Sequence, residues 1–336
     1  MSGLVLAVPS KGRIQEGAIA FLREAGLDIA RDPEARDYLG RIASLPGVEV
    51  RFLSASEIAS QLESGAAHIG ITGEDLLREQ TSDFDSAVAL LRPLGFARAD
   101  VVVAAPQSWI DVQSMADLDD VCLAFRARHH RHLRVATKYV ALTRSFFAAH
   151  GVSDYRIVES FGATEGAPAA GTAEIIVDIT STGQTLAANR LKVLRDGVIL
   201  RSQAHLAASL RARWTDGALS ALGLLLDRIA ARADADGLFE VRVVLPAAAS
   251  KRAEALAAEF GCEALVAAGT EEGGKAAEAG GVHHAFLCPG PQLHPLSLKL
   301  RQEGASIVRA MRVDYVFRSG DRVLDAFRAR ITPVSS

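Results

Sequence analysis

The chain has 336 residues, of which 49% are hydrophobic and 23% charged, and its net charge of −3 argues against a basic surface for nucleic acid or anionic membrane. Its three scattered cysteines form neither a disulfide framework nor a zinc pattern, and no apolar stretch is long enough to cross a membrane. The N-terminus lacks the basic and apolar regions of a signal peptide. We therefore expect a cytoplasmic protein whose partners include no membrane and no nucleic acid.

Apolar runs that suit buried strands alternate with amphipathic stretches that suit helices. The expected strands cover residues 4–8, 48–53, 68–72, 100–105, 133–137, 155–159, 174–179 and 193–201. The expected helices cover residues 13–25, 56–64, 73–79, 141–150, 163–170, 205–233, 250–260 and 293–304. This alternation is typical of α/β domains with parallel or mixed sheets.

A polar break at residues 234–237 precedes a different order of elements. Between residues 241 and 317 the expected order is strand, helix, strand, strand, helix, strand. That order fits a small ferredoxin-like α+β domain. The sequence thus predicts an α/β part followed by a separate domain at 236–336.

The most informative segment is the junction that follows the strand at 174–179. Asp178 lies near the end of the strand, and a turn rich in hydroxyl groups, from Thr180 to Thr185, leads into a short helical pattern. Free N–H groups at a helix start, hydroxyl donors and the flexible Gly183 together suit a phosphate, and Asp178 suits sugar hydroxyls. The alternative is an ordinary strand–turn–helix junction capped by Ser or Thr.

A second candidate site follows the first strand. Ser10, Lys11, Gly12 and Arg13 place two cations and a flexible backbone at the carboxyl end of that strand, where open α/β proteins bind ligands. An arginine fork and a lysine point charge suit a pyrophosphate or triphosphate. The alternative is a solvated loop.

Three more strand–turn–helix junctions carry polar side chains. Thr72 and Asp75 follow one strand, Lys138 follows another, and Glu159 and Glu165 flank the turn after a third. A helix-capping role explains Thr72 without any ligand. Because the junctions share one form, we expect several strand ends to line a common cleft.

The densest basic run lies at residues 126–134. It could contact a polyphosphate or a partner, but a solvated connector is the favoured interpretation. The chain contains no P-loop, no dinucleotide fingerprint and no nucleophile elbow.

Taken together, five segments resemble the ATP phosphoribosyltransferase family in both order and spacing. They are Ala7–Arg13, Gly70–Asp75, Ala136–Tyr139, Glu159–Glu165 and Asp178–Leu186. The resemblance covers about residues 4–210 and is specific because all five occur in order.

The resemblance implies a fold like that of the periplasmic binding proteins, with residues 1–95 and 185–235 in one α/β lobe and 96–184 in the other. It also implies the reaction, a glycosyl transfer in which N1 of ATP displaces pyrophosphate from 5-phosphoribosyl 1-pyrophosphate. The products are 1-(5-phosphoribosyl)-ATP and pyrophosphate, and the step opens histidine biosynthesis. Mg²⁺ is the expected cofactor, held through substrate phosphates rather than by protein ligands.

The resemblance further assigns roles to the candidate residues. Lys11, Arg13 and Asp178 are the expected catalytic residues, the first two facing polyphosphate and the third holding ribose hydroxyls. The expected substrate-binding residues are Ser10, Thr72, Asp75, Lys138, Glu159, Glu165, Thr180, Ser181, Thr182, Gly183, Gln184 and Thr185. Asp75 is expected to bind the nucleotide, and no general base is expected because adenine N1 has a free lone pair.

The family's compact form usually lacks a C-terminal domain and relies on a separate regulatory protein resembling histidyl-tRNA synthetase. Residues 126–134 resemble that form, and Val140-Ala141 stand where the family commonly has Pro-Asn. Residues 236–336 instead resemble, in layout, the regulatory domain of the long, hexameric form that histidine inhibits. We therefore expect histidine as an inhibitor and a homo-oligomer, hexamer or dimer, and keep the separate regulatory subunit as an alternative.

Three other functions fit parts of the pattern. A solute-binding protein would share the two-lobed fold, but the missing signal peptide argues against it. A cytoplasmic regulator that senses a phosphosugar or nucleotide without catalysis is the main alternative. A phosphoribosyltransferase of the common type would carry paired acidic residues before its phosphate loop, whereas only Asp178 stands here.

Overall fold

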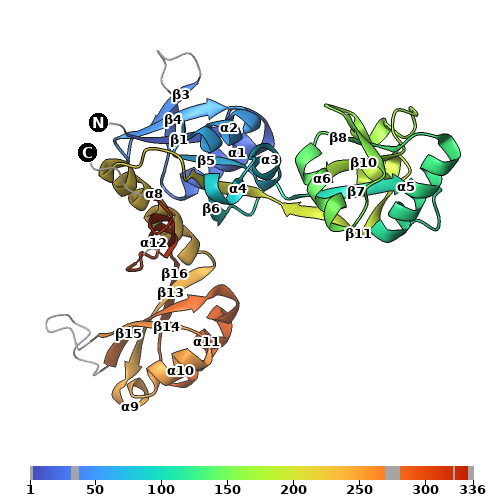
Figure 1. The fold of residues 1–336 in the computed structure, drawn as a ribbon. Coiled ribbons are helices and arrows are strands. Elements are labelled where there is room, and N and C mark those ends of the chain that lie inside the picture. Colours follow the sequence, from blue (N-terminus) through green and yellow to red (C-terminus); the bar gives the residue numbers. More distant parts are fainter. Residues whose placement is uncertain (1–2, 32–37, 269–280, 321, 332–336) are drawn as a thin grey trace. The chain divides into compact units, whose positions relative to one another are not determined.

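The computed structural model describes residues 3–31, 38–268, 281–320 and 322–331, and it divides into two compact units (Figure 1). The first unit comprises Met1–Leu224 with Arg322–Ser336, and the second comprises Leu225–Asp321. Each is described by itself. Within the described ranges, no helix is both long and apolar enough to span a membrane.

The first sheet of unit 1 has seven strands in the order β2-β3-β4-β1-β5-β12-β6. Its strands are β1 (Leu4–Pro9), β2 (Ile29–Arg31), β3 (Leu39–Ile42), β4 (Val48–Leu53), β5 (Ile69–Gly73), β6 (Val88–Pro93) and β12 (Ala204–Ser209). The central strand β1 runs parallel to β4 and β5. It is almost wholly buried, because helices cover both faces of a parallel sheet and so favour continuous apolar runs. The associated helices are α1 (Gly12–Glu24), α2 (Ala55–Ser64), α3 (Glu74–Gln80) and α4 (Phe84–Ala87).

Strand β12 corrects the helix expected over residues 205–233. All six residues of Ala204–Ser209 are buried, and the strand lies antiparallel between β5 and β6. The helix, α8, extends only over Asp216–Asp234. Small alanine-rich residues favour a helix locally, but burial on both sides inside a sheet outweighs that preference.

The second sheet of unit 1 has five strands in the order β11-β7-β10-β8-β9. They are β7 (Ala99–Pro106), β8 (Leu133–Thr137), β9 (Tyr155–Glu159), β10 (Ile175–Thr180) and β11 (Leu191–Ser202). Helices α5 (Met115–His129), α6 (Val140–Ala149) and α7 (Gln184–Ala188) accompany them. The helix expected at 163–170 is a single 3₁₀ turn, Thr164–Gly166. Strands β8, β9 and β10 are mutually parallel, so their carboxyl ends meet at one edge.

The expected boundaries of the two α/β lobes differ from the observed ones. Strand β11 pairs with β7 in the second sheet, so the chain returns to the first sheet at Gln203 rather than near residue 185. The short helix α7 directly after the loop suggested that the second lobe ended near residue 185. No local pattern in residues 184–190 reveals that the next strand, β11, pairs with β7. The two-lobed α/β core itself is confirmed.

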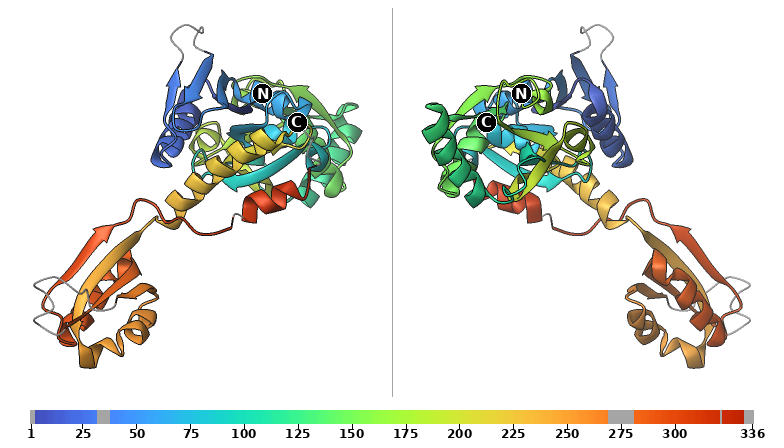
Figure 2. Two further views of the ribbon diagram at one scale, coloured as in Figure 1. Left: turned by 90° about the vertical axis from the view of Figure 1, so that its left-hand side faces the viewer. Right: turned by 90° about the vertical axis from the view of Figure 1, so that its right-hand side faces the viewer.

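Unit 2 has the expected ferredoxin-like order. It contains β13 (Leu238–Pro246), α9 (Ala247–Ser250), α10 (Ala253–Glu259), β14 (Glu263–Ala268), β15 (Gly281–Pro289), α11 (Gly290–Gln302) and β16 (Val308–Arg312). The strand order β14-β15-β13-β16 is antiparallel throughout. Helices α10 and α11 pack on one face of this sheet, as the orange part of Figure 2 shows, and they enclose a core around Val243, Phe286 and Leu296.

The last described helix, α12 (Arg322–Arg328), belongs to unit 1, so the domain expected at 236–336 ends earlier. Phe327 is buried and meets the ring of Trp214 edge-on at 4.9 Å, and the Trp214 Nε1–H donates to the carbonyl of Ser209. This aromatic contact joins residues more than a hundred positions apart, which no local pattern reveals.

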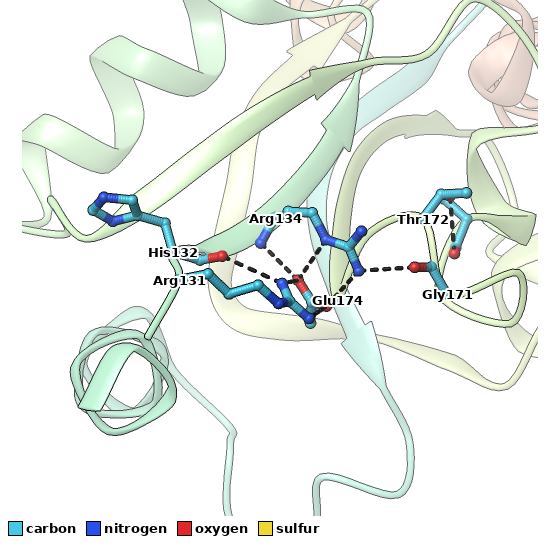
Figure 3. A network of polar contacts seen from close by, with 7 residues as sticks. Arg131, His132, Arg134, Gly171, Thr172 and Glu174 are labelled. Atoms are coloured by element: carbon cyan, nitrogen blue, oxygen red, sulfur yellow. Dashed lines mark hydrogen bonds and ion pairs between the residues drawn. The ribbon is translucent and has the colours of Figure 1, made fainter. Parts of the chain in front are cut away.

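The basic run at 126–134 is largely paired with acidic residues, as Figure 3 shows for its second half. Arg131 and Arg134 both donate to Glu174, at 2.9 and 2.8 Å, and Arg126 pairs with Asp154 at 3.2 Å. Burial opposes ionisation of Glu174, but the hydrogen bonds from the two arginines outweigh it and hold its pKa at about 2. The network lies where β8 and β10 begin, the edge opposite to their carboxyl ends.

We predict that Glu174→Gln lowers the free energy of unfolding by about 1–2 kcal/mol at pH 7. Because the folded pKa lies below the ordinary 4.5, the stabilisation is complete above pH 4.5 and is lost as the pH falls toward 2. Urea denaturation at a series of pH values measures this. Glu259→Gln, at an exposed site, is the control. A difference between wild type and Glu174→Gln that does not shrink at low pH would contradict the charge-based explanation.

Candidate active site

The carboxyl edge of the second sheet brings three of the predicted residues together. Strand β10 runs parallel to β8 with Ile175 opposite Val135 and Ile176 opposite Ala136. Asp178 and Lys138 follow these pairs at the same offset in sequence, and the Lys138 ammonium is close enough to lower the pKa of Asp178. Strand β9 is parallel to β8 with Glu159 opposite Thr137. A lysine and two carboxylates therefore line one edge.

Asp178 is half-buried, and the surroundings set its protonation. Burial raises the pKa of its carboxyl, Glu165 raises it further, and the Ile179 N–H and the Lys138 ammonium oppose this. The Ile179 N–H donates to Oδ1 at 2.8 Å. Among the described residues no group donates to Oδ2, so that oxygen can accept a ligand hydroxyl.

The hydroxyl-rich loop is held by its own side chains. Thr180 Oγ1 accepts the Gly183 N–H at 2.9 Å, and Thr182 Oγ1 accepts the Gln184 N–H at 3.4 Å. Gly183 has φ +73°, in the left-handed region, and helix α7 begins at the next residue. Ser181, Thr182, Gln184 and Thr185 are exposed. Among the described residues, no protein group forms a hydrogen bond with the Ser181 or Thr185 hydroxyl. Both hydroxyls can therefore donate to an oxyanion.

Lys11 and Arg13 lie at the carboxyl edge of the first sheet. Ser10 directly follows β1, its N–H donating to the carbonyl of Leu53 at 2.8 Å, and Gly12, with φ +77°, starts α1. Both cations are exposed, and neither has an acidic partner in the part of the chain that the structure describes. The first turn of α1 contains no acidic residue, so this helix start remains favourable for anions.

Two predicted residues of the first sheet are buried and occupied by protein contacts. Thr72 is wholly buried, and its hydroxyl donates to the carbonyl of Ala55 at 3.3 Å. Asp75 is 6% exposed, and its carboxylate accepts hydrogen bonds from the Ser202 and Tyr139 hydroxyls. In the structure both side chains are therefore held by protein contacts instead of facing solvent.

The turn after β9 is also organised by side chains. The Thr164 hydroxyl donates to Ser160 Oγ at 3.0 Å, and Ala163 has φ +49°. Glu159 is exposed and Glu165 is partly exposed. Both carboxylates are therefore accessible to a ligand, and Glu165 is close enough to affect Asp178.

Sequence reasoning missed Tyr139 and Ser202. Tyr139 is fully buried, and its hydroxyl donates to Asp75 at 2.8 Å, while Ser202 lies at the end of β11. A buried tyrosine hydroxyl needs a partner, so Tyr139, directly after Lys138, carried a detectable signal. Ser202 carried none, because its partner is 127 positions away.

Comparison with known proteins supports the resemblance. The family model described as ATP phosphoribosyltransferase (HisG) matches residues 54–231. The ATP phosphoribosyltransferase of Nitrobacter hamburgensis is 56% identical over 319 residues, which cover 94% of each chain. That of Rhodopseudomonas palustris (strain BisA53) is 55% identical over 317 residues, or 93% of each chain.

A solved structure agrees with these relatives. The ATP phosphoribosyl transferase (HisG:HisZ) complex from Thermotoga maritima is 25% identical, with a TM-score of 0.50, over 67% of this chain and 97% of that chain. The alternative of a regulator without catalysis loses support, because the curated relatives are named for an enzyme. The matched family model and the identity along nearly the whole length show that the chain belongs to the ATP phosphoribosyltransferase family, whose reaction is the first step of histidine biosynthesis.

Proposed function

We propose that the chain catalyses the reaction of its family with the phosphoribosyl donor held at the carboxyl edge of the second sheet. In that reaction N1 of ATP displaces pyrophosphate from 5-phosphoribosyl 1-pyrophosphate. The observation that carries the proposal is the alignment of Lys138 with Asp178 beside the open hydroxyl loop.

The loop from Thr180 to Thr185 takes the 5-phosphate. Gly183 keeps the backbone turned, and the exposed hydroxyls of Ser181 and Thr185 supply donors without competing protein acceptors among the described residues. Thr180 and Thr182 shape the loop, because their oxygens accept backbone N–H groups. Such a preformed loop binds a phosphate with little loss of conformational entropy.

Asp178 holds the ribose. It lies two residues before the loop, so a sugar whose 5-phosphate is in the loop has its ring hydroxyls near this carboxylate. Oδ2 accepts those hydroxyls, and the negative charge favours the positive character that develops at C1 as the bond to pyrophosphate breaks.

Lys11, Arg13 and Lys138 neutralise phosphate charge. All three are exposed, and in the described residues none of their charges is offset by an ion pair. Lys138, close to Asp178, contacts anionic oxygens of the donor, and Lys11 and Arg13 face the polyphosphates at the first sheet with Ser10 beside them. Aligning two anions and stabilising the leaving group accounts for the rate, and no protein base is needed.

The site residues fit the proposed cofactor, Mg²⁺. The accessible carboxylates of Glu159 and Glu165 suit hydrogen bonds to the water molecules that this ion carries, while the substrate phosphates supply its direct oxygen ligands. When bound, the ion neutralises charge on the pyrophosphate oxygens. The described residues include no cluster of three His, Cys, Asp or Glu with the geometry of a metal site, so the substrate phosphates complete the proposed coordination.

Unit 2 is the proposed regulatory part, with histidine as its inhibitor. Its support is the ferredoxin-like order, which suits the sensing of a small ligand, and its presence in curated relatives that match nearly the full chain. The similar structure from Thermotoga maritima is a HisG:HisZ complex, so a separate subunit is the competing arrangement. We further propose a homo-oligomer, hexamer or dimer, working in the cytoplasm.

The first test is turnover itself. We expect the purified chain to form 1-(5-phosphoribosyl)-ATP from both substrates with Mg²⁺, EDTA to abolish the reaction, and excess Mg²⁺ to restore it, as product absorbance records. Metal-independent turnover would contradict the role of Mg²⁺. Turnover only after addition of a regulatory subunit would favour the competing arrangement, and none in either mixture would contradict the assignment.

We predict that Asp178→Asn lowers kcat/KM for the phosphoribosyl donor by about 10- to 100-fold, since a hydrogen bond to a charged group contributes about 1.5–3 kcal/mol. The KM for ATP should change little. Because burial raises the pKa of Asp178, wild-type kcat/KM should fall on the acid side at a higher pH than for an ordinary aspartate, and the variant should lose this dependence. Steady-state kinetics against pH measure both effects.

The control is Asp120→Asn, which removes an exposed carboxylate from α5. It should behave as wild type. An unchanged kcat/KM for the donor in Asp178→Asn would remove this residue from the proposed site.

We predict that millimolar histidine slows turnover. The inhibitor is a small zwitterion, and isoleucine at the same concentration is the control for charge and ionic strength. An unchanged rate with histidine would contradict a histidine-sensing role for unit 2, while leaving the catalytic assignment in place.

A further inference from the structure

The Asp75 carboxylate is fully engaged by protein hydroxyls. Its Oδ1 accepts the Ser202 hydroxyl at 2.8 Å, and its Oδ2 accepts the Tyr139 hydroxyl at 2.8 Å. The Asp75 N–H donates in turn to Ser202 Oγ at 3.1 Å. Burial and the neighbouring Asp75 charge raise the pKa of Tyr139, so the phenol keeps the proton that it donates. Both oxygens of this buried carboxylate already accept hydrogen bonds from protein hydroxyls, so little hydrogen-bonding capacity remains for a nucleotide.

Gly73 makes room for this carboxylate. A Cβ at residue 73 would lie 2.3 Å from Asp75 Oδ1, well inside van der Waals contact, although the backbone there, with φ −69°, accepts any residue. The absence of a side chain at residue 73 is therefore needed for Asp75 to hold its position and not for the local turn.

Glu79, one turn further along α3 than Asp75, holds the start of helix α6. Its carboxylate accepts the N–H groups of Ala141 at 2.9 Å and Leu142 at 3.0 Å. Helix α6 has no capping side chain of its own, so these two backbone donors depend on Glu79. Asp75 and Glu79 are four residues apart and so share one face of α3.

The contacts of Asp75 with Tyr139 and of Glu79 with the start of α6 together hold the segment that directly follows Lys138. Lys138 lies between Thr137, the end of β8, and Tyr139, the N-cap residue of α6. The Tyr139 N–H donates to Thr137 Oγ1 at 2.8 Å, which tightens the turn around Lys138. Anchoring Tyr139 to α3 therefore restricts where the Lys138 ammonium can point.

We propose that Asp75 and Glu79 are positioning residues that act on the phosphoribosyl donor through Tyr139 and Lys138, and that Asp75 does not itself bind the nucleotide. The inference rests on the proposed contact of Lys138 with the donor. It replaces the role expected for Asp75 from the family resemblance.

A double-mutant cycle tests the inference in the full-length enzyme. We expect Tyr139→Phe and Asp75→Asn each to lower kcat/KM for the donor about tenfold and to leave the KM for ATP within about twofold. In a Lys138→Gln background neither substitution should have a further effect, because the group that they position is gone. Gly73→Ala, which displaces Asp75 without changing its charge, should reproduce the loss.

The matched control is Tyr155→Phe, which removes a phenol hydroxyl from the same sheet but packs against Phe147 away from the edge. It should keep wild-type kinetics. Melting temperatures of every variant separate loss of fold from loss of function, and Tyr139→Phe, which keeps the ring, remains informative if Asp75→Asn fails to fold.

Three outcomes would overturn the inference. A higher KM for ATP in Asp75→Asn, with normal donor kinetics in Tyr139→Phe, would show direct nucleotide binding by Asp75. Losses that persist in the Lys138→Gln background would show a merely structural role. Wild-type kinetics of Lys138→Gln alone would refute the proposed role of Lys138 itself, and with it this inference, whereas the first two outcomes leave that role intact.

Discussion

The parallel alignment of β8 and β10 is the constraint on which the proposed site depends. A shift of one residue in their register would turn Asp178 to the other face of the sheet and away from Lys138. The register is set by the buried cluster that contains Val135, Ile175 and Val177, so the packing of the core also determines where the charged side chains at the strand ends lie. Residues of the buried core thereby determine where the Asp178 carboxylate and the Lys138 ammonium lie.

The loop and the sheet edges could be predicted because their signals are local. Strand, hydroxyl-rich turn, glycine and helix follow one another within a few residues from Asp178 to Thr185, and the polar strand ends carrying Lys11 and Lys138 are equally compact. Parallel strands then place such ends at shared edges without further information. Helix α5 also had a local signal that was missed, since Ser114 and Asp117 form a reciprocal capping box at its start.

The features that the sequence did not reveal depend on contacts between residues far apart in the chain. Nothing near Asp75 indicates that Ser202 and Tyr139 occupy its oxygens, so only the family resemblance suggested a role for this residue, as a nucleotide ligand. Nothing near Ala204 indicates that both of its neighbours in space are strands, so an alanine-rich run was interpreted as helix. Burial, which no local pattern states, makes Ala204–Ser209 a strand and underlies the positioning role proposed for Asp75.

The return of α12 to unit 1 makes unit 2 an insertion rather than an appendage. The chain leaves unit 1 within α8 and rejoins it at α12, where Leu324 approaches Gly223 of α8 and Phe327 contacts Trp214. The two ends of the inserted segment are therefore held close together by the packing of α12 against residues 214–223 of unit 1. A single peptide-bond cleavage near residue 224 would leave unit 2 covalently joined only to α12, whose packing against Trp214 would keep it on unit 1. Nicked protein would then migrate as two fragments only after denaturation.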